Sequence, residues 1–540
     1  MNRQEMLERA LAESEPWSVI VIGGGATGVG VALDAAARGY RTLLLERHDF
    51  GKGTSSRSTK LVHGGVRYLE QGNVSLVMEA LRERGILRQN APHLVGELRF
   101  IVPSYSWWEG PFYGIGLKLY QSLSGRYGFG SSQLLSKEET LRSLPNIKTE
   151  GLHGGVVYYD GQFDDTRLLI NLVATAAEQG ASLLNYAPVT GLLKDPDGLV
   201  TGVRVQDLES GREFTARGKV IINATGPFTD DLRRLADPEC RPMIAPSQGV
   251  HIVLDRSFLP SDTAIMVPHT SDGRVMFAIP WHGHTLVGTT DTPIPSVPVE
   301  PVPMDQEIGF LLETAGLYLE KKPTRSDILS TFAGVRPLVR MGDGKNTAAL
   351  SRDHTIHIDP SGVVTLCGGK WTTYRNMAED CVTQAAVLAR LNEQPSVTRH
   401  LNIHGYHQHA DRFGRLAVYG SDAPAIQDLI RHEPALGEPL HPALPIGGAE
   451  VVWAVRHEMA RTVEDVLARR TRALFLNARA ALEMAPAVAR LMARELGQDP
   501  SWVPQQLEAF EEVARGFLVS DEAHYITGVA MPLDAGFSIR

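Results

Sequence analysis

The first strong hydrophobic pattern in the chain is a run of four β-branched residues at 19–22 without a polar break. Such an unbroken run is typical of a strand that is buried on both faces of a parallel sheet. A glycine-rich turn follows it, and the Ala-rich residues 29–38 predict a helix that Gly39 caps. Residues 42–45 form a second apolar run, which ends at Glu46. The pattern therefore predicts a strand–turn–helix–strand unit.

Further apolar runs predict strands along much of the remaining chain, at residues 220–223, 251–254, 275–279, 285–288 and 363–366. The last of these runs leads into a predicted helix from about residue 373 to 391. Residues 293–303 contain five prolines, which favours an extended loop over a helix. Beyond residue 393 the pattern changes, because residues 394–445 are rich in loops and residues 451–497 are strongly helical.

Composition narrows the function classes. A length of 540 residues corresponds to about three or four structural units. The net charge of −9 argues against a nucleic-acid partner, since such proteins usually carry a basic excess. Three cysteines without a CxxC pair exclude a disulfide scaffold and fit a reducing compartment. The first 17 residues lack the apolar core of a signal peptide, and no apolar run reaches 18 residues, so we expect no membrane span.

The turn after the first strand has the dinucleotide-binding spacing Gly23-x-Gly25-x-x-Gly28. The first glycine suits a tight turn, the second a close approach to a pyrophosphate, and the third close packing of the helix on the strand. Glu46 closes the second strand, where an acid is expected to bind the ribose hydroxyls. These features together predict a dinucleotide site rather than a structural turn.

Two distant segments point to the same site. The strand at 220–223 ends in Ala224-Thr225-Gly226, and the strand at 363–366 runs into Gly368-Gly369. A dinucleotide site that three separate segments visit is typical of proteins whose FAD-binding domain is interrupted by a substrate domain. We therefore expect FAD rather than NAD.

A polar loop rich in hydroxyls and glycine follows the predicted unit, and it is suited to cradle a flavin and to bind an oxyanion. Its candidate cofactor contacts are Thr54, Ser55, Ser56, His63, Gly64 and Gly65.

At this point the chain resembles the FAD-dependent, respiratory glycerol-3-phosphate dehydrogenases. The strings that carry the resemblance run in order along some 350 residues: 23–28 with 34–39 (DAAARG), 54–56 (TSS), 63–70 (HGGVRYLE), 288–291 (GTTD), 334–338 (GVRPL), 351–353 (SRD) and 368–375 (GGKWTTYR). The sequence departs from the family pattern at Val66, where Leu is expected, and at Trp371, where a smaller apolar residue is expected.

The resemblance implies an α/β FAD-binding (Rossmann-like) domain, an interleaved α+β substrate domain of mostly antiparallel sheet, and a helical C-terminal domain. The expected FAD-binding segments are residues 17–95, 151–245 and 351–395. Residues 96–150 form an aromatic segment that contacts membranes, residues 246–350 form the substrate domain, and residues 396–540 form the helical domain.

The resemblance also implies a substrate pocket above the flavin. Its expected ligands for the substrate phosphate are cationic or hydroxyl side chains: Arg67, Tyr68, Arg336, Arg352 and Lys370. It places Ala224, Gly226, Gly369, Lys370 and Thr372 against the cofactor.

Oxidation of an alcohol at a flavin also needs a group that takes the hydroxyl proton. His63 fits this role by its ordinary pKa, but it could instead hold the flavin or the glycine-rich loop in place. Arg336 could stabilise the developing alkoxide, with water or another group as the base. Both residues are therefore catalytic candidates. A histidine cluster at residues 400–409 lacks the further ligands of a metal site, and we expect no metal.

Residues 99–129 contain nine aromatic residues, with Lys118 and Arg126 among them. This composition suits either an aromatic core or a shallow membrane contact around an amphipathic helix near residues 114–120. The resemblance to a respiratory enzyme favours the membrane.

The expected function is oxidation of sn-glycerol 3-phosphate to dihydroxyacetone phosphate, with hydride passing to FAD and electrons to a membrane quinone. The expected location is cytoplasmic, peripheral to the inner face of the cell membrane. Three alternatives stay open: an oxidase of the same substrate that uses oxygen, an amine or amino-acid oxidase of the same architecture, and a nonenzymatic FAD-binding protein. The oligomeric state also stays open, with a homodimer as one option.

Overall fold

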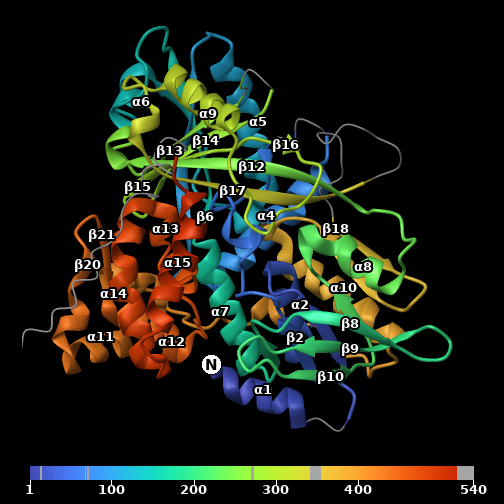
Figure 1. The fold of residues 1–540 in the computed structure, drawn as a ribbon. Coiled ribbons are helices and arrows are strands. Elements are labelled where there is room, and N and C mark those ends of the chain that lie inside the picture. Colours follow the sequence, from blue (N-terminus) through green and yellow to red (C-terminus); the bar gives the residue numbers. More distant parts are fainter. Residues whose placement is uncertain are drawn as a thin grey trace, which may run out of the picture.

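The computed structural model describes residues 1–12, 15–66, 69, 72–268, 270, 273–340 and 354–519. Figure 1 shows an α/β body that carries α1 (Arg3–Ala12) at one end. Long strands of a second sheet rise from this body, and the C-terminal helices pack beside them.

The α/β body is built on a mostly parallel sheet with the strand order β18-β19-β11-β1-β2-β7. β1 lies at its centre, where Ile22 pairs with Asn223 of β11 on one side and with Leu45 of β2 on the other. β11 in turn pairs in parallel with β19. The three segments that the sequence predicted to share one site are therefore adjacent strands. Their bounds are β1 (Val19–Ile22), β2 (Thr42–Leu45), β7 (Ser182–Leu184), β11 (Ile221–Asn223), β18 (His354–Ile358) and β19 (Val364–Gly368).

Helices cover this sheet because their apolar faces need a partner. α2 is almost entirely buried, and its small residues let α7 and α10 approach it closely. A three-strand meander of β8, β9 and β10 lies beside the body, as judged from the described residues. The bounds are α2 (Ala26–Ala37), α7 (Asp165–Glu178), α8 (Thr229–Ala236), α10 (Tyr374–Leu388), β8 (Val189–Lys194), β9 (Val200–Gln206) and β10 (Glu213–Arg217).

The second sheet confirms the predicted interleaved substrate domain of mostly antiparallel strands. Its order is β16-β12-β15-β14-β13-β4-β6-β3, with β17 added on β12 and β5 on β6. Its strands come from both sides of the second α/β segment in the sequence. Their bounds are β3 (Leu61–Val62), β4 (Val95–Ser104), β5 (Gln133–Ser136), β6 (Gly154–Phe163), β12 (Ile244–Asp255), β13 (Thr263–Val267), β14 (Met276–Trp281), β15 (His284–Gly288), β16 (Thr292–Pro293) and β17 (Ile328–Val339).

The aromatic segment divides into two parts. β4 pairs with β6 along its whole length, so its aromatic residues belong to the sheet. The amphipathic helix that follows, α5 (Glu109–Ser124), is longer than the one or two turns that the sequence predicted. α6 (Lys137–Ser143) lies in the same segment, whereas α4 (Val74–Asn90) precedes it and α9 (Asp305–Tyr318) comes later in the chain.

The C-terminal module is helical, as expected, with a small hairpin. It shares one hydrophobic core with the second sheet. Its elements are η9 (Ala410–Asp422), α11 (Ala423–His432), β20 (Pro439–His441), β21 (Leu444–Gly447), α12 (Gly448–His457), η11 (Asp465–Arg470), α13 (Ala473–Leu476), α14 (Ala478–Leu496) and α15 (Trp502–Arg515).

Buried charges fasten this module to the α/β body. Asp49 accepts hydrogen bonds from Arg469 (2.6 Å) and from both terminal nitrogens of Arg470 (2.7 and 2.9 Å). Lys52 reaches Glu464 at 2.5 Å. Because these side chains are largely excluded from water, removing one partner would leave a buried charge uncompensated.

One residue of the histidine cluster, His404, connects the same two parts of the fold. His404 lies between Glu178 of α7 (2.6 Å) and Asp422 of η9 (2.8 Å). Burial alone would lower the pKa of His404, but its bonds to Asp422 and Glu178 outweigh burial and raise the pKa to about 9. Its charged form therefore joins the two parts of the fold.

Stability should fall as the pH rises from about 6.5 to 9. The charged imidazolium of His404 stabilises the folded state fully below its unfolded pKa, which is near 6.5 for histidine. This stabilisation is lost as the pH rises through the folded pKa of about 9. Because the ring is partly exposed, we expect a loss of about 1–2 kcal/mol. Urea unfolding across this range should show the loss in the wild type and in His432→Gln, an exposed control, and not in His404→Gln. An equal loss in His404→Gln would contradict the assignment.

Candidate active site

The turn between β1 and α2 is shaped for close backbone approach. Gly23 has a φ of +114°, and a Cβ there would lie 2.5 Å from the carbonyl oxygen of Ala224. A Cβ on Gly28 would lie 1.9 Å from the carbonyl oxygen of Gly23. Both positions therefore require glycine, one to let β11 approach and one to let α2 pack on the turn.

The N-terminus of α2 is directed at a polar partner. The Ala26 N–H donates to the Ser55 hydroxyl at 2.9 Å, and the Gly24 N–H donates to the Glu46 carboxylate at 2.5 Å. Burial raises the pKa of Glu46, although hydrogen bonds from the backbone of His48 and Gly24 oppose the rise. A glycine-rich turn that leads into a helix N-terminus, with an acid close by, is the arrangement that binds a pyrophosphate and a ribose.

The hydroxyl-rich loop brings distant segments together. The Thr54 hydroxyl donates to the carbonyl of Val335 in β17 at 2.6 Å. The Trp371 indole N–H donates to the carbonyl of Ser55 at 2.9 Å, and the His63 N–H donates to the Thr372 hydroxyl at 3.2 Å. Trp371, which departs from the expected family pattern, thus fastens the third α/β segment to the first.

These elements surround one continuous cavity of about 1240 Å³. Ordinary small-molecule pockets hold about 300–1,000 Å³, so this cavity has room for a dinucleotide and a small substrate. The predicted residues that line it are Gly23, Gly25, Glu46, Thr54, Ser55, His63, Gly65, Ala224, Gly226, Arg336, Gly369, Lys370 and Thr372.

Three residues that we predicted as cofactor contacts do not line the cavity. Gly28 packs against the turn itself. Ser56 is buried, and its carbonyl accepts from Lys60 at 2.6 Å. The Gly64 N–H donates to the Tyr120 hydroxyl at 2.7 Å. These residues shape the loop from behind. Arg67, Tyr68 and Arg352 lie outside the described residues.

Arg336 lines the cavity and is held there by polar partners. Its guanidinium donates to the Asp291 carboxylate (3.1 Å), the Thr289 hydroxyl (3.2 Å) and the Thr290 carbonyl (2.9 Å). A Cβ on Gly249 would lie 2.4 Å from this guanidinium, so the glycine makes room for it. A cation fixed in this way meets an anion at little entropic cost.

Sequence reasoning missed His251 of β12. It lines the cavity, and its Nε2 lies 2.9 Å from the Thr59 hydroxyl. Burial lowers its pKa well below the ordinary value, and Lys60 and Arg336 lower it further, so the imidazole is neutral near pH 7. A single histidine within an apolar strand gives no motif, so the sequence carried no signal for it.

The comparisons with known proteins agree with this geometry. Residues 18–375 match the family of FAD dependent oxidoreductases, and residues 363–502 match the C-terminal domain of alpha-glycerophosphate oxidase. The mitochondrial glycerol-3-phosphate dehydrogenase of Rattus norvegicus is 41% identical over 92% of this chain and 73% of its own length. The Arabidopsis thaliana enzyme of the same name is 40% identical, over 98% of this chain and 90% of its own length. This chain belongs to the FAD-dependent glycerol-3-phosphate dehydrogenase family.

A solved structure supports the same assignment. The glycerol-3-phosphate dehydrogenase from Bacillus halodurans, complexed with FAD, has 30% identity and a TM-score of 0.77 over 95% of this chain and 97% of its own. The cofactor of this protein is therefore FAD. The residues present fit it, because the glycine turn, Glu46 and the N-terminus of α2 all face one long cavity. When bound, FAD supplies the group that accepts a hydride.

Cofactor binding should depend on Gly25. A valine there would place methyl groups between the N-terminus of α2 and the incoming pyrophosphate, since even a Cβ would lie 3.1 Å from the Ser55 hydroxyl. We expect Gly25→Val to purify folded but without visible flavin absorbance. Gly96→Val is the matched control, because a Cβ on Gly96 meets no atom within 4 Å. Full flavin content in Gly25→Val would contradict the assigned turn.

Proposed function

We propose that this protein oxidises sn-glycerol 3-phosphate to dihydroxyacetone phosphate, with hydride passing to FAD and electrons passing on to a membrane quinone. The observation that carries the proposal is the pair of cations, Arg336 and Lys370, on the wall that also holds His63 and the hydroxyl loop. Phosphate recognition needs such cations, and a guanidinium presents a planar fork to an oxyanion. The names of the relatives agree with this substrate.

The reaction removes a hydride from the carbinol carbon and a proton from its hydroxyl group. Arg336 and Lys370 would hold the phosphate, and this contact would aim the carbinol at the flavin. A neutral imidazole would accept the hydroxyl proton, and both His63 and His251 line the cavity. Arg336 would also stabilise negative charge that develops on the substrate oxygen.

The substrate and the cations can be tested together. Under anaerobic conditions glycerol 3-phosphate should bleach the flavin of the wild type. Arg336→Ala and Lys370→Ala should keep FAD but lose about 1.5–3 kcal/mol of charge-assisted binding, or about tenfold or more in kcat/KM. Arg325→Ala is the control, because Arg325 forms an exposed pair with Asp305.

Each failed outcome has a distinct meaning. If glycerol 3-phosphate does not bleach the wild-type flavin, the proposed substrate is wrong. If amino acids bleach it instead, the amine or amino-acid oxidase alternative holds. If the wild type is bleached and both variants behave as Arg325→Ala does, the two cations do not contact the substrate.

The quinone part of the proposal rests on an exposed apolar face of α5. Phe112, Ile115 (74% exposed) and Leu119 form this face of the helix, and Trp107 (81% exposed) and Trp108 extend it just before the first turn. Lys118 and Arg126 lie close to them in the sequence, where they suit anionic headgroups. Exposed patches of this kind mark membrane or protein contacts, and the added bases favour a lipid surface.

The buried side of α5 contacts the hydroxyl-rich loop at Gly64. The Tyr120 hydroxyl accepts from the Gly64 N–H at 2.7 Å and donates to Asp160 at 2.7 Å. Figure 1 places α5 at the end of the molecule remote from α1. In this proposal one face of α5 contacts lipid and the other contacts Gly64, next to His63 in the cavity wall. This arrangement would bring a lipid-soluble acceptor close to the flavin site, which supports electron transfer to a quinone.

The proposed location is peripheral, on the cytoplasmic face of the cell membrane. None of the helices in the described part of the chain combines the length and the apolar composition that crossing a bilayer demands. Binding would therefore come from α5 lying in the interface, where each basic residue contributes about 1 kcal/mol near anionic lipid.

Removing exposed apolar side chains from α5 and from the residues just before it should weaken binding of the protein to lipid. We expect Trp107→Ser combined with Ile115→Ser to weaken cosedimentation with anionic liposomes and to slow quinone reduction. Reduction of a soluble dye should be spared, because the flavin half-reaction does not use the lipid contact. Val387→Ser removes an equally exposed side chain from α10 and serves as the control. Unchanged lipid binding in the double variant would place the membrane contact elsewhere, and rapid reoxidation by air would favour the oxidase alternative.

A further inference from the structure

The C-terminal module contacts the strand that carries Arg336. The Ser330 hydroxyl of β17 donates to the Leu474 carbonyl at 2.8 Å, and the Thr331 N–H donates to the Phe517 carbonyl at 2.8 Å. These two residues lie a few positions before Arg336 on the same strand. The helical module therefore holds β17 at the end that precedes its cavity-lining residues Gly334 and Arg336.

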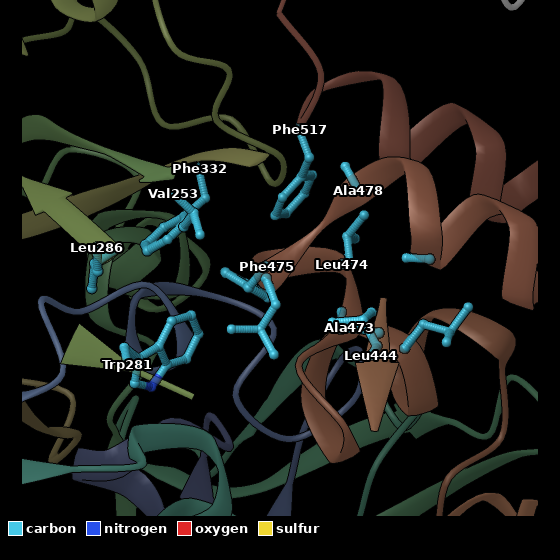
Figure 2. Close-up of a cluster of buried hydrophobic side chains, with 14 of the residues drawn as sticks. Val253, Trp281, Leu286, Phe332, Leu444, Ala473, Leu474, Phe475, Ala478 and Phe517 are labelled. Carbon is cyan, nitrogen blue, oxygen red and sulfur yellow. The ribbon is translucent and has the colours of Figure 1, made fainter. Parts of the chain in front are cut away.

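A line of rings continues this contact into the cavity. Phe475 of α13 meets Phe332 of β17 edge to face, with ring centres 4.9 Å apart. Phe332 then stacks on His251, with centres 4.8 Å apart and an angle of 15° between the planes. Figure 2 shows Phe475 projecting from the helical module toward Phe332 and Trp281 of the sheet. All three residues of the line are buried.

His251 has little freedom on its other sides. A Cβ on Gly288 would lie 2.1 Å from the imidazole Cδ2, so the ring fills the space that this glycine leaves. Its Nε2 is fixed by Thr59, whereas its buried Nδ1 has no hydrogen-bond partner among the described residues. One hydrogen bond and one stacking face therefore set the orientation of the ring.

We propose that Phe475 is a positioning residue of the active site, which holds the imidazole of His251 in place through Phe332. The helical module thus acts on the reaction without touching the substrate. The part of this inference that concerns catalysis rests on the proposed function. The part that concerns the orientation and hydration of His251 does not.

The surroundings of His251 make the proposal measurable. Burial lowers its pKa most, followed by the charges of Lys60 and Arg336. Lys60 is itself paired with Asp165, and Arg336 with Asp291. Phe475 also lies against Lys60, with 5.2 Å between the ammonium and the ring centre, so a shift in the titration of His251 in Phe475→Leu reports a change in its surroundings, through lost packing, entry of water or the neighbouring lysine.

The test compares Phe475→Leu with Phe510→Leu in the FAD-bound protein. Phe510 of α15 is buried in the same core but is not part of the ring line. In histidine-labelled NMR, the His251 signal is identified by its loss in His251→Gln. We expect this signal to stay untitrated near pH 6 in the wild type and in Phe510→Leu, and to move toward the ordinary pKa of about 6.5 in Phe475→Leu.

The kinetic arm uses anaerobic flavin reduction by glycerol 3-phosphate. Phe475→Leu should slow reduction about tenfold, since misplacing a group by a fraction of an ångström is costly, and the acid limb of its pH profile should move to higher pH. The double variant Phe475→Leu/His251→Gln should be no slower than His251→Gln alone, because both changes act on one group. If Phe475→Leu does not fold, Phe475→Met provides the same comparison with a flexible side chain that fills irregular gaps more readily.

Two results would overturn the inference. One is a His251 titration in Phe475→Leu that matches that of Phe510→Leu. The other is a slowing that adds to that of His251→Gln with an unchanged pH profile, because this would make Phe475 a merely structural residue. A wild-type flavin that glycerol 3-phosphate does not reduce would overturn the proposed function, and the NMR arm would still decide the inference.

Discussion

One buried ion pair, Lys60 with Asp165, fixes the place where the parts of this fold meet. The Lys60 ammonium lies 2.7 and 2.9 Å from the two carboxylate oxygens and donates to the Ser56 carbonyl at 2.6 Å. Rings from the sheet and from the helical module surround it: Trp281, Phe332 and Phe475, at 5.1–5.3 Å from their centres. Without either partner, the other charge would be left in an apolar core at a cost of about 3–5 kcal/mol. The arrangement is therefore strongly determined.

The conformation of the hydroxyl-rich loop depends on this ion pair. Asp165 also accepts from the N–H and the hydroxyl of Ser58, so the first residue of α7 orders both ends of the segment between the loop and β3. Thr59 lies within this segment and binds His251. The position of the ion pair therefore determines where this part of the cavity wall lies. The loop is held in place by these side-chain contacts.

The sequence predicted those parts of the fold that have a local signal. The runs at 19–22 and 42–45 became β1 and β2 without a shift, and the glycine spacing correctly indicated the tight turn between β1 and α2. His251 and Phe475 could not be predicted, because each is one residue in an apolar stretch and its role comes from a neighbour more than 80 positions away. The length of α5 was underestimated because glycines within it and aromatic residues on both faces obscured its helical period.

Several of the residues that line the cavity lie in a segment rich in glycine and serine, residues 51–66. Such a segment can expose its backbone to a ligand, but it adopts one defined conformation only when other elements hold it. Here α5 holds Gly64 through Tyr120, and Asp165 holds Lys60 from α7. The helical module adds Phe475 against the same lysine. The reactive wall is thus set by partners on several sides. This explains why α5 and the C-terminal module, both outside the cavity, contribute to the geometry of its wall.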